Sequence, residues 1–426
     1  MKKILFILLC LCLFGCQDYK DKTPKQEIKK ELSSLQLSQR GGIGIWGGEG
    51  NENGYYTIHT TNEDIRYITY YDYQTLQEIA LCQKPECQHK DTSCSAFIEG
   101  RPPFICTYGN YVYLIENNGF AFNALGEKSQ VARITQMNLD GSHRQTLFEA
   151  ENGYEFHTRD ICFDDENIYI VMYKNERIET NLDYMLTVTK DEYLYKINIE
   201  TKEVTKLMDM SHKVIKGVDD RMIIFEEFVY KEDPQTYIDK KDFKGYERIM
   251  KNSDLYNGTI HVDTLEVESK KSKNKDGGSY YKNKYYYMKD NILYCFNLKS
   301  EKEEKIMSFP KEGIYGDNGR SSFIDDYYII DEWKDEETYK TSYCISLKDY
   351  SKKELTQKIK KRNEPMRILA QTDKELLVVY DAEGQNEKTW AGTMQFNETK
   401  QYIGLISKED YFNNKKTFKE IKILGD

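Results

Sequence analysis

The sequence predicts an all-β protein, a β-propeller of four-stranded blades, and three observations lead to this prediction. Tyr is abundant, with 35 residues against 18 Phe and only 7 Pro, and this bias favours β-strands. Two kinds of hairpin pattern alternate along the chain. Their first turns recur at a pitch of about 50 residues, with one gap about twice as long, which suits propeller blades. These turns lie near Asn110, Asp165, Asp220, Asp326 and Asp373.

The first hairpin of each repeat combines an apolar strand, an acidic or Asn turn and an aromatic-rich strand. Examples are "CFDDENIYIVMY" from Cys162, "KGVDDRMIIFEEF" from Lys216 and "SFIDDYYIIDEW" from Ser322. The second hairpin has an alternating strand, a polar turn and a further strand, as in "LYKINIETKEVTKLM" and "LYCFNLKSEKEEKIM". Two hairpins in each repeat supply the four strands of one blade.

The number of blades depends on the long gap between two of the turns. A degenerate unit around residues 257–278, together with a unit that precedes Cys82, gives the favoured count of seven. The alternative is six blades, one of them with an insertion at residues 231–284. We expect the two ends of the chain to meet in one shared blade, because an open ring would leave an unpaired strand edge.

The chain begins with the features of a secretory signal peptide. Lys2 and Lys3 precede a short apolar stretch over residues 4–14, which is shorter than the roughly 20 residues of a membrane-spanning helix. The sequence Leu-Phe-Gly-Cys that ends at Cys16 resembles the bacterial lipobox. This resemblance implies cleavage after residue 15 and diacylglycerol on the Cys16 sulfur. The alternatives are an ordinary cleaved signal with an incidental cysteine, or an uncleaved anchor.

These features predict three regions and a location. Residues 1–15 form a lipoprotein signal peptide, and residues 16–41 form a lipidated, flexible tether that is charged and polar. Residues 42–426 form the propeller. The expected location is the extracytoplasmic face of the cell membrane, with membrane lipid held through acylated Cys16.

The charge of the chain argues against one class of partner. Its net charge is −10 at neutral pH, and no long basic stretch offsets this value. Nucleic acid is therefore not an expected ligand. We expect a monomer.

The densest group of reactive side chains lies in "LCQKPECQHKDTSC", within a loop at residues 82–106 that links two blades. Outside the cytoplasm disulfides persist, so the favoured prediction is two disulfides among Cys82, Cys87, Cys94 and Cys106, with no cofactor. A pairing of Cys87 with Cys94 and of Cys82 with Cys106 is one possibility. The alternative is a structural zinc site of the Cys3His type, with Cys82, Cys87, His89 and Cys94 as ligands. Free thiols are the third possibility.

Catalytic motifs are absent, and no catalytic residue is predicted. The chain has no G-x-S-x-G, H-E-x-x-H or P-loop pattern. Pairs such as Asp164-Asp165 and Asp325-Asp326 are interpreted as turn residues in preference to calcium ligands. The favoured function is a membrane-anchored module that binds a glycan, a peptide or a partner protein. The alternative is a propeller hydrolase or lyase that uses carboxylates at the central channel.

The order of lipobox, charged tether, Tyr-rich strand pair and Cys-rich loop resembles a group of uncharacterised lipoproteins of low-GC Gram-positive bacteria. Its compact motif matches here at Cys82, Pro85, Cys87, His89 and Cys94. The resemblance implies a propeller similar in pattern to the TolB type and the low-density-lipoprotein-receptor type. It implies no particular activity.

Overall fold

The computed structural model describes most of the chain from Ser33 onward as one compact unit. It describes residues 33–38 and 48–425, apart from 62, 101, 118–130, 158–159, 180–184, 273, 275–276, 317–321, 335–338, 360–361 and 389–393. The predicted signal peptide, Cys16 and the first part of the tether lie outside the described residues. Every described strand pair and core cluster lies within 33–426, so this part of the chain contains the whole described fold.

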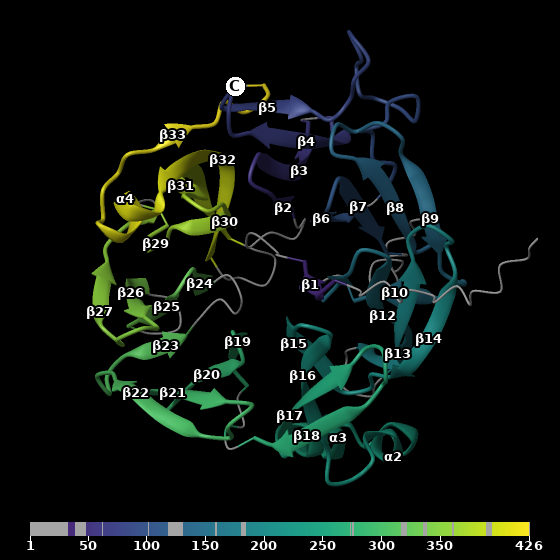
Figure 1. Cartoon of the computed structure of the whole chain (residues 1–426), viewed down its shortest axis with the longest axis vertical. Helices are drawn as coiled ribbons and strands as arrows, with labels where there is room; N and C mark the ends of the chain where they lie inside the picture. The colour runs from purple at the N-terminus through teal and green to yellow at the C-terminus, as the bar shows by residue number, and fades with distance from the viewer. Residues whose placement is uncertain are drawn as a thin grey trace, which may run out of the picture. The chain divides into compact units, whose positions relative to one another are not determined.

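Seven antiparallel sheets stand around a central axis, and each is one blade of a β-propeller (Figure 1). The first blade contains β2 (Glu49–Gly50), β3 (Gly54–Thr60), β4 (Arg66–Asp72) and β5 (Gln77–Ala80). The second contains β6 (Phe104–Tyr108), β7 (Tyr111–Glu116), β8 (Arg133–Asn138) and β9 (Gln145–Glu149). The third contains β10 (Tyr154–Phe156), β11 (Cys162–Phe163), β12 (Asn167–Glu179), β13 (Met185–Asn198) and β14 (Val204–Asp209). The fourth contains β15 (Lys213–Asp219), β16 (Met222–Val229), β17 (Asp254–His261) and β18 (Val267–Lys271).

The remaining three blades complete the ring. The fifth contains β19 (Ser279–Tyr281), β20 (Lys284–Lys289), β21 (Ile292–Asn297) and β22 (Glu303–Ser308). The sixth contains β23 (Ile314–Gly316), β24 (Phe323–Ile324), β25 (Tyr327–Trp333), β26 (Tyr339–Ser346) and β27 (Lys352–Leu355). The seventh contains β30 (Arg367–Gln371), β31 (Glu375–Lys388), β32 (Met394–Ser407) and β33 (Lys419–Glu420). The short pair β28 (Lys358–Ile359) and β29 (Glu364–Pro365) links the sixth and seventh blades, and α4 (Lys408–Phe412) follows β32.

The predicted fold and the favoured count of seven blades are confirmed. However, the long stretch between the first turns at Asp220 and Asp326 contains different helices and strands from those expected. Two helices, α2 (Pro234–Asp239) and α3 (Phe243–Lys251), lie between β16 and β17 of the fourth blade. The stretch 257–271, assigned to a degenerate unit, supplies β17 and β18 of that blade. The fifth blade begins at β19. The range 231–284 therefore contains these helices and also strands of two blades.

The core lies between neighbouring blades, and strand alternation creates it. Along β7, Val112 and Leu114 face the first blade, whereas Tyr113 and Ile115 face the third. All four side chains are fully buried. Because both faces of a blade are covered, its central strands carry large apolar or aromatic residues at successive positions. The same burial accounts for part of the Tyr content, since Tyr113, Tyr169, Tyr285, Tyr286 and Tyr328 are among the largest fully buried side chains.

The ring closes by an apolar cluster and a short backbone contact between the first and seventh blades, and not by one blade shared between the two ends. The first and seventh blades each consist of strands that are consecutive in the chain. The residues after β33 instead run beside β5, with a parallel bridge between Gln77 and Lys422. The Glu78 N–H donates to the Lys422 carbonyl at 2.8 Å, and the Lys422 N–H donates to that of Leu76 at 3.0 Å. The C-terminal residues thereby cover the outer edge of the first blade.

The end of the predicted tether belongs to the fold. Residues 33–38 include β1 (Gln36–Leu37), which pairs antiparallel with β11 of the third blade. Leu35 is buried with residues of the third and fourth blades, and Leu37 packs against the same cluster. The flexible tether expected up to residue 41 is therefore wrong for residues 33–38, because these two leucines find a core.

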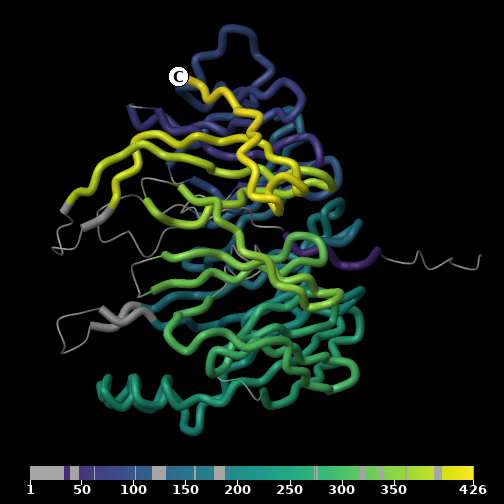
Figure 2. Tube along the Cα trace, turned by 90° about the vertical axis from the view of Figure 1, so that its left-hand side faces the viewer, coloured from purple at the N-terminus to yellow at the C-terminus, as the bar shows by residue number. Residues whose placement is uncertain are grey.

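The second and third strands and their connection are extended in several blades. In the third and seventh blades the hairpins β12–β13 and β31–β32 consist of strands of 13 or 14 residues. In the fourth blade α2 and α3 lie between β16 and β17, and in the second blade residues 117–132 separate β7 from β8. Strand direction alternates within a blade, so these connections lie at the opposite end of the blades from the first-to-second turns. Figure 2 shows the two long hairpins and the helices on one side of the ring and β1 toward the other. Ser33 lies beside the first-to-second turns, since the Asp165 N–H donates to its Oγ at 3.1 Å.

Arg221 joins the third blade, the fourth blade and the incoming N-terminal segment. Its five N–H donors make five hydrogen bonds. Nη1 donates to Asp164 Oδ2 at 2.9 Å and to the Ser33 carbonyl at 2.8 Å. Nε and Nη2 donate to the two carboxylate oxygens of Asp263 at 2.9 and 2.7 Å, and Nη2 also donates to the Tyr169 hydroxyl at 3.2 Å. One guanidinium thus holds three segments of the chain together.

Asp164 shows why acidic pairs recur at the first turns. Its carboxylate is fully buried, and Oδ1 accepts the backbone N–H groups of Glu166 at 2.9 Å and Asn167 at 2.7 Å. These bonds satisfy the donors of the turn between β11 and β12. The interpretation of the Asp pairs as turn residues is confirmed at this position. At the sixth blade, Asp325 instead accepts from Lys408 Nζ of the seventh blade at 2.6 Å.

We expect Arg221→Met to destabilise the fold by about 3 kcal/mol, because it leaves the buried Asp164 carboxylate without its cation. Chemical unfolding of residues 33–426 measures this change. The matched control is Lys270→Met, which breaks the solvent-exposed Lys270–Glu301 ion pair and should cost less than about 1 kcal/mol. Equal effects of the two substitutions would contradict the assigned role of Arg221.

The Arg221 network also predicts a dependence on pH. The hydrogen bond from Arg221 lowers the pKa of Asp263 below its ordinary value. A carboxyl group with a lowered folded-state pKa stabilises the fold above its unfolded pKa of about 4, and this contribution disappears as the pH falls through the folded-state value. The difference in unfolding free energy between the wild type and Asp263→Asn should be present at neutral pH and shrink in acid. Urea titrations at several pH values test this, and a constant difference would count against it.

Candidate metal centre and central channel

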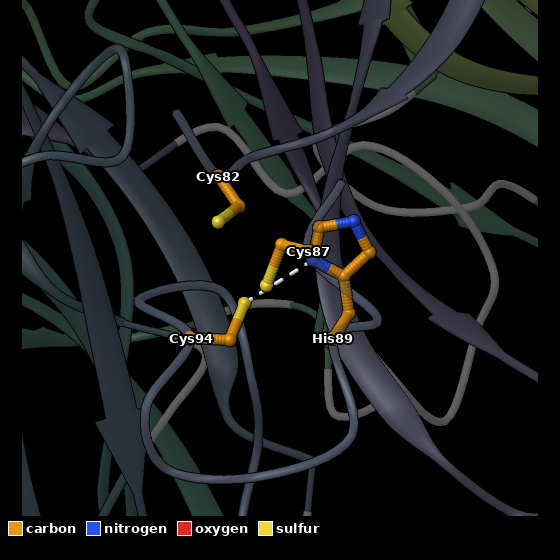
Figure 3. Close-up of side chains that lie close together, drawn as sticks. All are labelled: Cys82, Cys87, His89 and Cys94. Atoms are coloured by element: carbon orange, nitrogen blue, oxygen red, sulfur yellow. Dashed lines mark hydrogen bonds between the residues drawn. The ribbon is translucent and has the colours of Figure 1, made fainter. Parts of the chain in front are cut away.

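Three cysteines and one histidine converge in the loop between β5 and β6. Figure 3 shows the side chains of Cys82, Cys87, His89 and Cys94 directed toward one another. One potential ligand atom from each residue lies within 4.8 Å of the others. His89 Nδ1 is 3.2 Å from Cys94 Sγ. Cys94 is buried, and the other three side chains are half-buried.

Local turns and pairing with the first blade hold this loop in place. The Cys87 N–H donates to the Lys84 carbonyl at 3.3 Å, and the Cys94 N–H donates to that of Asp91 at 3.1 Å. After the last cysteine the chain returns to the first blade. The Ile68 N–H donates to the Ala96 carbonyl at 2.9 Å, within an extension of the sheet beside β4. The loop therefore continues the outer edge of the first blade beyond the four residues of β5.

The surroundings of the cluster affect its thiols differently. Burial raises the pKa of the Cys94 thiol to about 12. Burial acts in the same direction on Cys82, but hydrogen bonds from the Lys84 backbone N–H and from the Cys94 and Cys87 thiols outweigh it, and the pKa of Cys82 lies below its ordinary value. Burial lowers the pKa of His89. The neutral imidazole is therefore favoured, and this form carries a lone pair that can bind a metal.

Arg144, which the sequence did not indicate, braces the loop from the second blade. Its Nη1 donates to the carbonyls of Ser95 at 3.0 Å and Phe97 at 2.7 Å. Burial lowers the pKa of Arg144, and the neighbouring Glu116 and Cys94 act in the opposite direction. Arg144 follows the β8–β9 turn, about 50 residues after the cluster, so no local pattern could have linked it to the cysteines.

The structure brings together three of the four cysteines in the favoured disulfide set, and it places the fourth elsewhere. Successive residues of β6 face opposite sides of the sheet. Ile105 lies in the same core cluster as Cys94, whereas Cys106 lies with Tyr113 in the cluster toward the third blade. A bond between Cys82 and Cys106 is therefore not compatible with the described course of β6. Cys162, Cys295 and Cys344 lie in strands of the third, fifth and sixth blades, and all three are buried.

The inner strands surround a cavity of about 450 Å³ in the central channel. Its lining includes Leu37 of β1 and aromatic residues of the fifth and sixth blades. The rings of Tyr281 and Phe323 stack there, with centroids 4.7 Å apart. Two carboxylates also line the cavity, and both have close partners. Asp220 Oδ1 accepts from Ser34 Oγ at 2.8 Å, and Asp219 forms an ion pair with Lys299 at 3.1 Å.

Within the ranges given above, the Cys/His cluster is the one group of three or more potential metal ligands. His157 does pair with a carboxylate, Glu192 Oε1, at 3.1 Å. This partner lies in the neighbouring strand β13, and Tyr173 packs edge-on against the His157 ring. His157 follows β10, and these two contacts hold its partly buried ring.

No described helix is long and apolar enough to cross a membrane.

No family model and no curated protein matches the chain. Among solved structures, the β-propeller domain of the Trilobed protease from Pyrococcus furiosus is similar at 11% identity and a TM-score of 0.39, with 89% of this chain and 99% of that one covered. The oligogalacturonate lyase from Vibrio parahaemolyticus is similar at 11% identity and a TM-score of 0.39, with 89% and 92% covered. Dipeptidyl peptidase 4 from Porphyromonas gingivalis is similar at 10% identity and a TM-score of 0.38, with 88% and 51% covered.

Proposed function

We propose that this protein is a lipoprotein anchored at the extracytoplasmic face of the cell membrane, with a propeller that binds a glycan, a peptide or a partner protein. Acylation of Cys16 provides the anchor. The signal-like N-terminus and the resemblance to uncharacterised lipoproteins of low-GC Gram-positive bacteria support the location. The fold supports a binding role, because a propeller presents a broad face built from many loops.

The observation that carries the proposal is the placement of Ser33–Ser38 relative to the long strand connections. The described chain enters the ring beside the first-to-second turns, next to Asp165 and Asp220. The linker between Cys16 and Ser33 reaches at most about 60 Å when extended and on the order of 20 Å as a flexible coil. An anchor at Cys16 would therefore attach the propeller through the end that carries the first-to-second turns, which is opposite to the end with the long connections.

The face at the end with the long connections has the features of a recognition surface. Two hairpins, β12–β13 and β31–β32, extend beyond the shorter strands of the other blades. Helix α3 buries Phe243 and Ile249 on one side. The polar residues that lie between these two in the sequence are on its other side. Long connections on a rigid scaffold commonly carry binding residues, because the scaffold fixes their ends while their sequence is free to vary.

The enzymatic alternative has no specific observation in its favour. The two carboxylates at the channel cavity, Asp219 and Asp220, make contacts that stabilise neighbouring strands and the N-terminal segment. An acid and a base for glycoside hydrolysis need a pair of carboxyl groups about 5–10 Å apart across a substrate. The described contacts give no reason to assign such a pair.

We expect Cys16→Ser to release the protein from the membrane, since it removes the sulfur that accepts the lipid. Metabolic labelling with a fatty acid, followed by fractionation of cells, measures both lipidation and location. Cys12→Ser in the apolar stretch is the matched control and should remain labelled and membrane-bound. Retention of label and membrane location by Cys16→Ser would exclude the proposed anchor.

We expect a shortened β31–β32 hairpin to weaken ligand binding at least 10-fold. If it is closed with Asn-Gly between the paired residues Gln385 and Asn397, Glu398 keeps its bonds to Arg362 and Arg367, and the melting temperature should change little. Binding of residues 33–426 to glycan and peptide arrays, and capture of proteins from detergent-solubilised membranes, measure this change. Glu301→Gln, in the β21–β22 turn at the opposite end of the blades, is the control. Unchanged binding would show that the ligand-binding site does not include this hairpin. Release of a product from the array would favour the enzymatic alternative.

A further inference from the structure

We propose that Cys82, Cys87, His89 and Cys94 bind one structural zinc ion. The convergence of these four side chains carries the proposal. In a tetrahedral site with metal–sulfur bonds of about 2.3 Å, neighbouring ligand atoms lie about 3.8 Å apart. The four atoms here already lie within 4.8 Å of one another, and His89 Nδ1 is 3.2 Å from Cys94 Sγ. Small side-chain rotations therefore suffice to close the site.

The number of ligands favours zinc over disulfides. Three thiols meet at the cluster, and the fourth cysteine of the loop region, Cys106, faces a different core. One disulfide among the three would leave a half-buried or buried thiol beside His89. Three thiolates and one imidazole instead fill the four positions of a closed site. A site closed by four protein ligands holds zinc for structure and leaves no position for substrate.

The surroundings can stabilise the charge of such a site. Three thiolates, one neutral imidazole and Zn²⁺ carry a net charge of −1. The guanidinium of Arg144 lies close enough to interact with Cys94 while it binds the loop carbonyls. Contacts of this kind orient ligands and raise metal affinity.

The ion would fix a segment on which the first blade depends. Strand β5 covers only residues 69–72 of the edge of β4, and the loop covers more of that edge through the bridge between Tyr67 and Phe97. Zinc would hold residues 82–94 compact, so that this bridge forms at little entropic cost. Binding displaces the thiol protons and involves no change of oxidation state. It would also occupy the thiols that could otherwise oxidise outside the cytoplasm.

The proposal can be tested with two preparations of residues 33–426. One is secreted through an oxidising route, and the other is produced in a reducing cytosol. Elemental analysis and native mass spectrometry should find one zinc per chain in both preparations. Cobalt substitution should give the absorption of tetrahedral thiolate coordination. Cys87→Ser and His89→Ala should lose stoichiometric zinc, whereas the control Cys344→Ala should retain it.

Arg144→Gln provides a second variant in case the ligand substitutions do not fold. It retains all four ligands and should weaken zinc binding about 10- to 100-fold in competition with a chelator. The cobalt spectrum should be unchanged once the site is saturated, which distinguishes a positioning residue from a ligand. A secreted wild-type chain with a disulfide among Cys82, Cys87 and Cys94 and no metal would overturn the proposal. The proposal would also be overturned if the three thiols are free and reduced and do not bind zinc in an oxygen-free solution. Neither result bears on membrane anchoring or on ligand binding.

Discussion

Each blade of this protein is stable because its two faces are covered by its neighbours. The main apolar clusters lie between successive sheets, where side chains such as Tyr113 and Leu114 are fully buried from opposite faces of one strand. Burial at this level contributes about 2 kcal/mol for each large side chain. No blade can keep that contribution alone, because separation from one neighbour exposes a whole face. The ring must therefore be complete, and the positions of all loops follow from that requirement.

Sequence periodicity was sufficient to predict the fold and the number of blades, because both hairpin families carry their own turn residues. It placed the first turns correctly near Asp165, Asp220 and Asp326. The fourth and fifth blades were divided wrongly, since α2 and α3 interrupt one repeat and move its second hairpin along the chain. The binding of β1 to β11 was missed as well. Two leucines in a polar stretch do not indicate a strand, because the core that they join is formed by residues of other blades. No local sequence pattern identifies those residues.

The candidate metal centre shows the same division between local and distant information. Spacing alone identified Cys82, Cys87, His89 and Cys94 as one possible ligand set, but it could not separate them from Cys106. That separation depends on which residues of β6 face the first blade, and strand alternation fixes only that Ile105 and Cys106 face opposite ways. The bracing by Arg144 comes from another blade. Contacts between blades are set by ring geometry, so they became visible only in the structure.

The position at which the N-terminal segment joins the ring has a mechanical consequence. A force on the chain before Ser33 reaches the ring at the third and fourth blades, through β1 and the guanidinium of Arg221. The first and seventh blades, between which the ring closes, are joined by a shared apolar cluster and by the short contact at Lys422. The load thus enters away from this seam. Because β1 lies antiparallel to β11, a pull along the length of β1 would load its hydrogen bonds together in shear, whereas a strand peeled sideways would lose them one at a time.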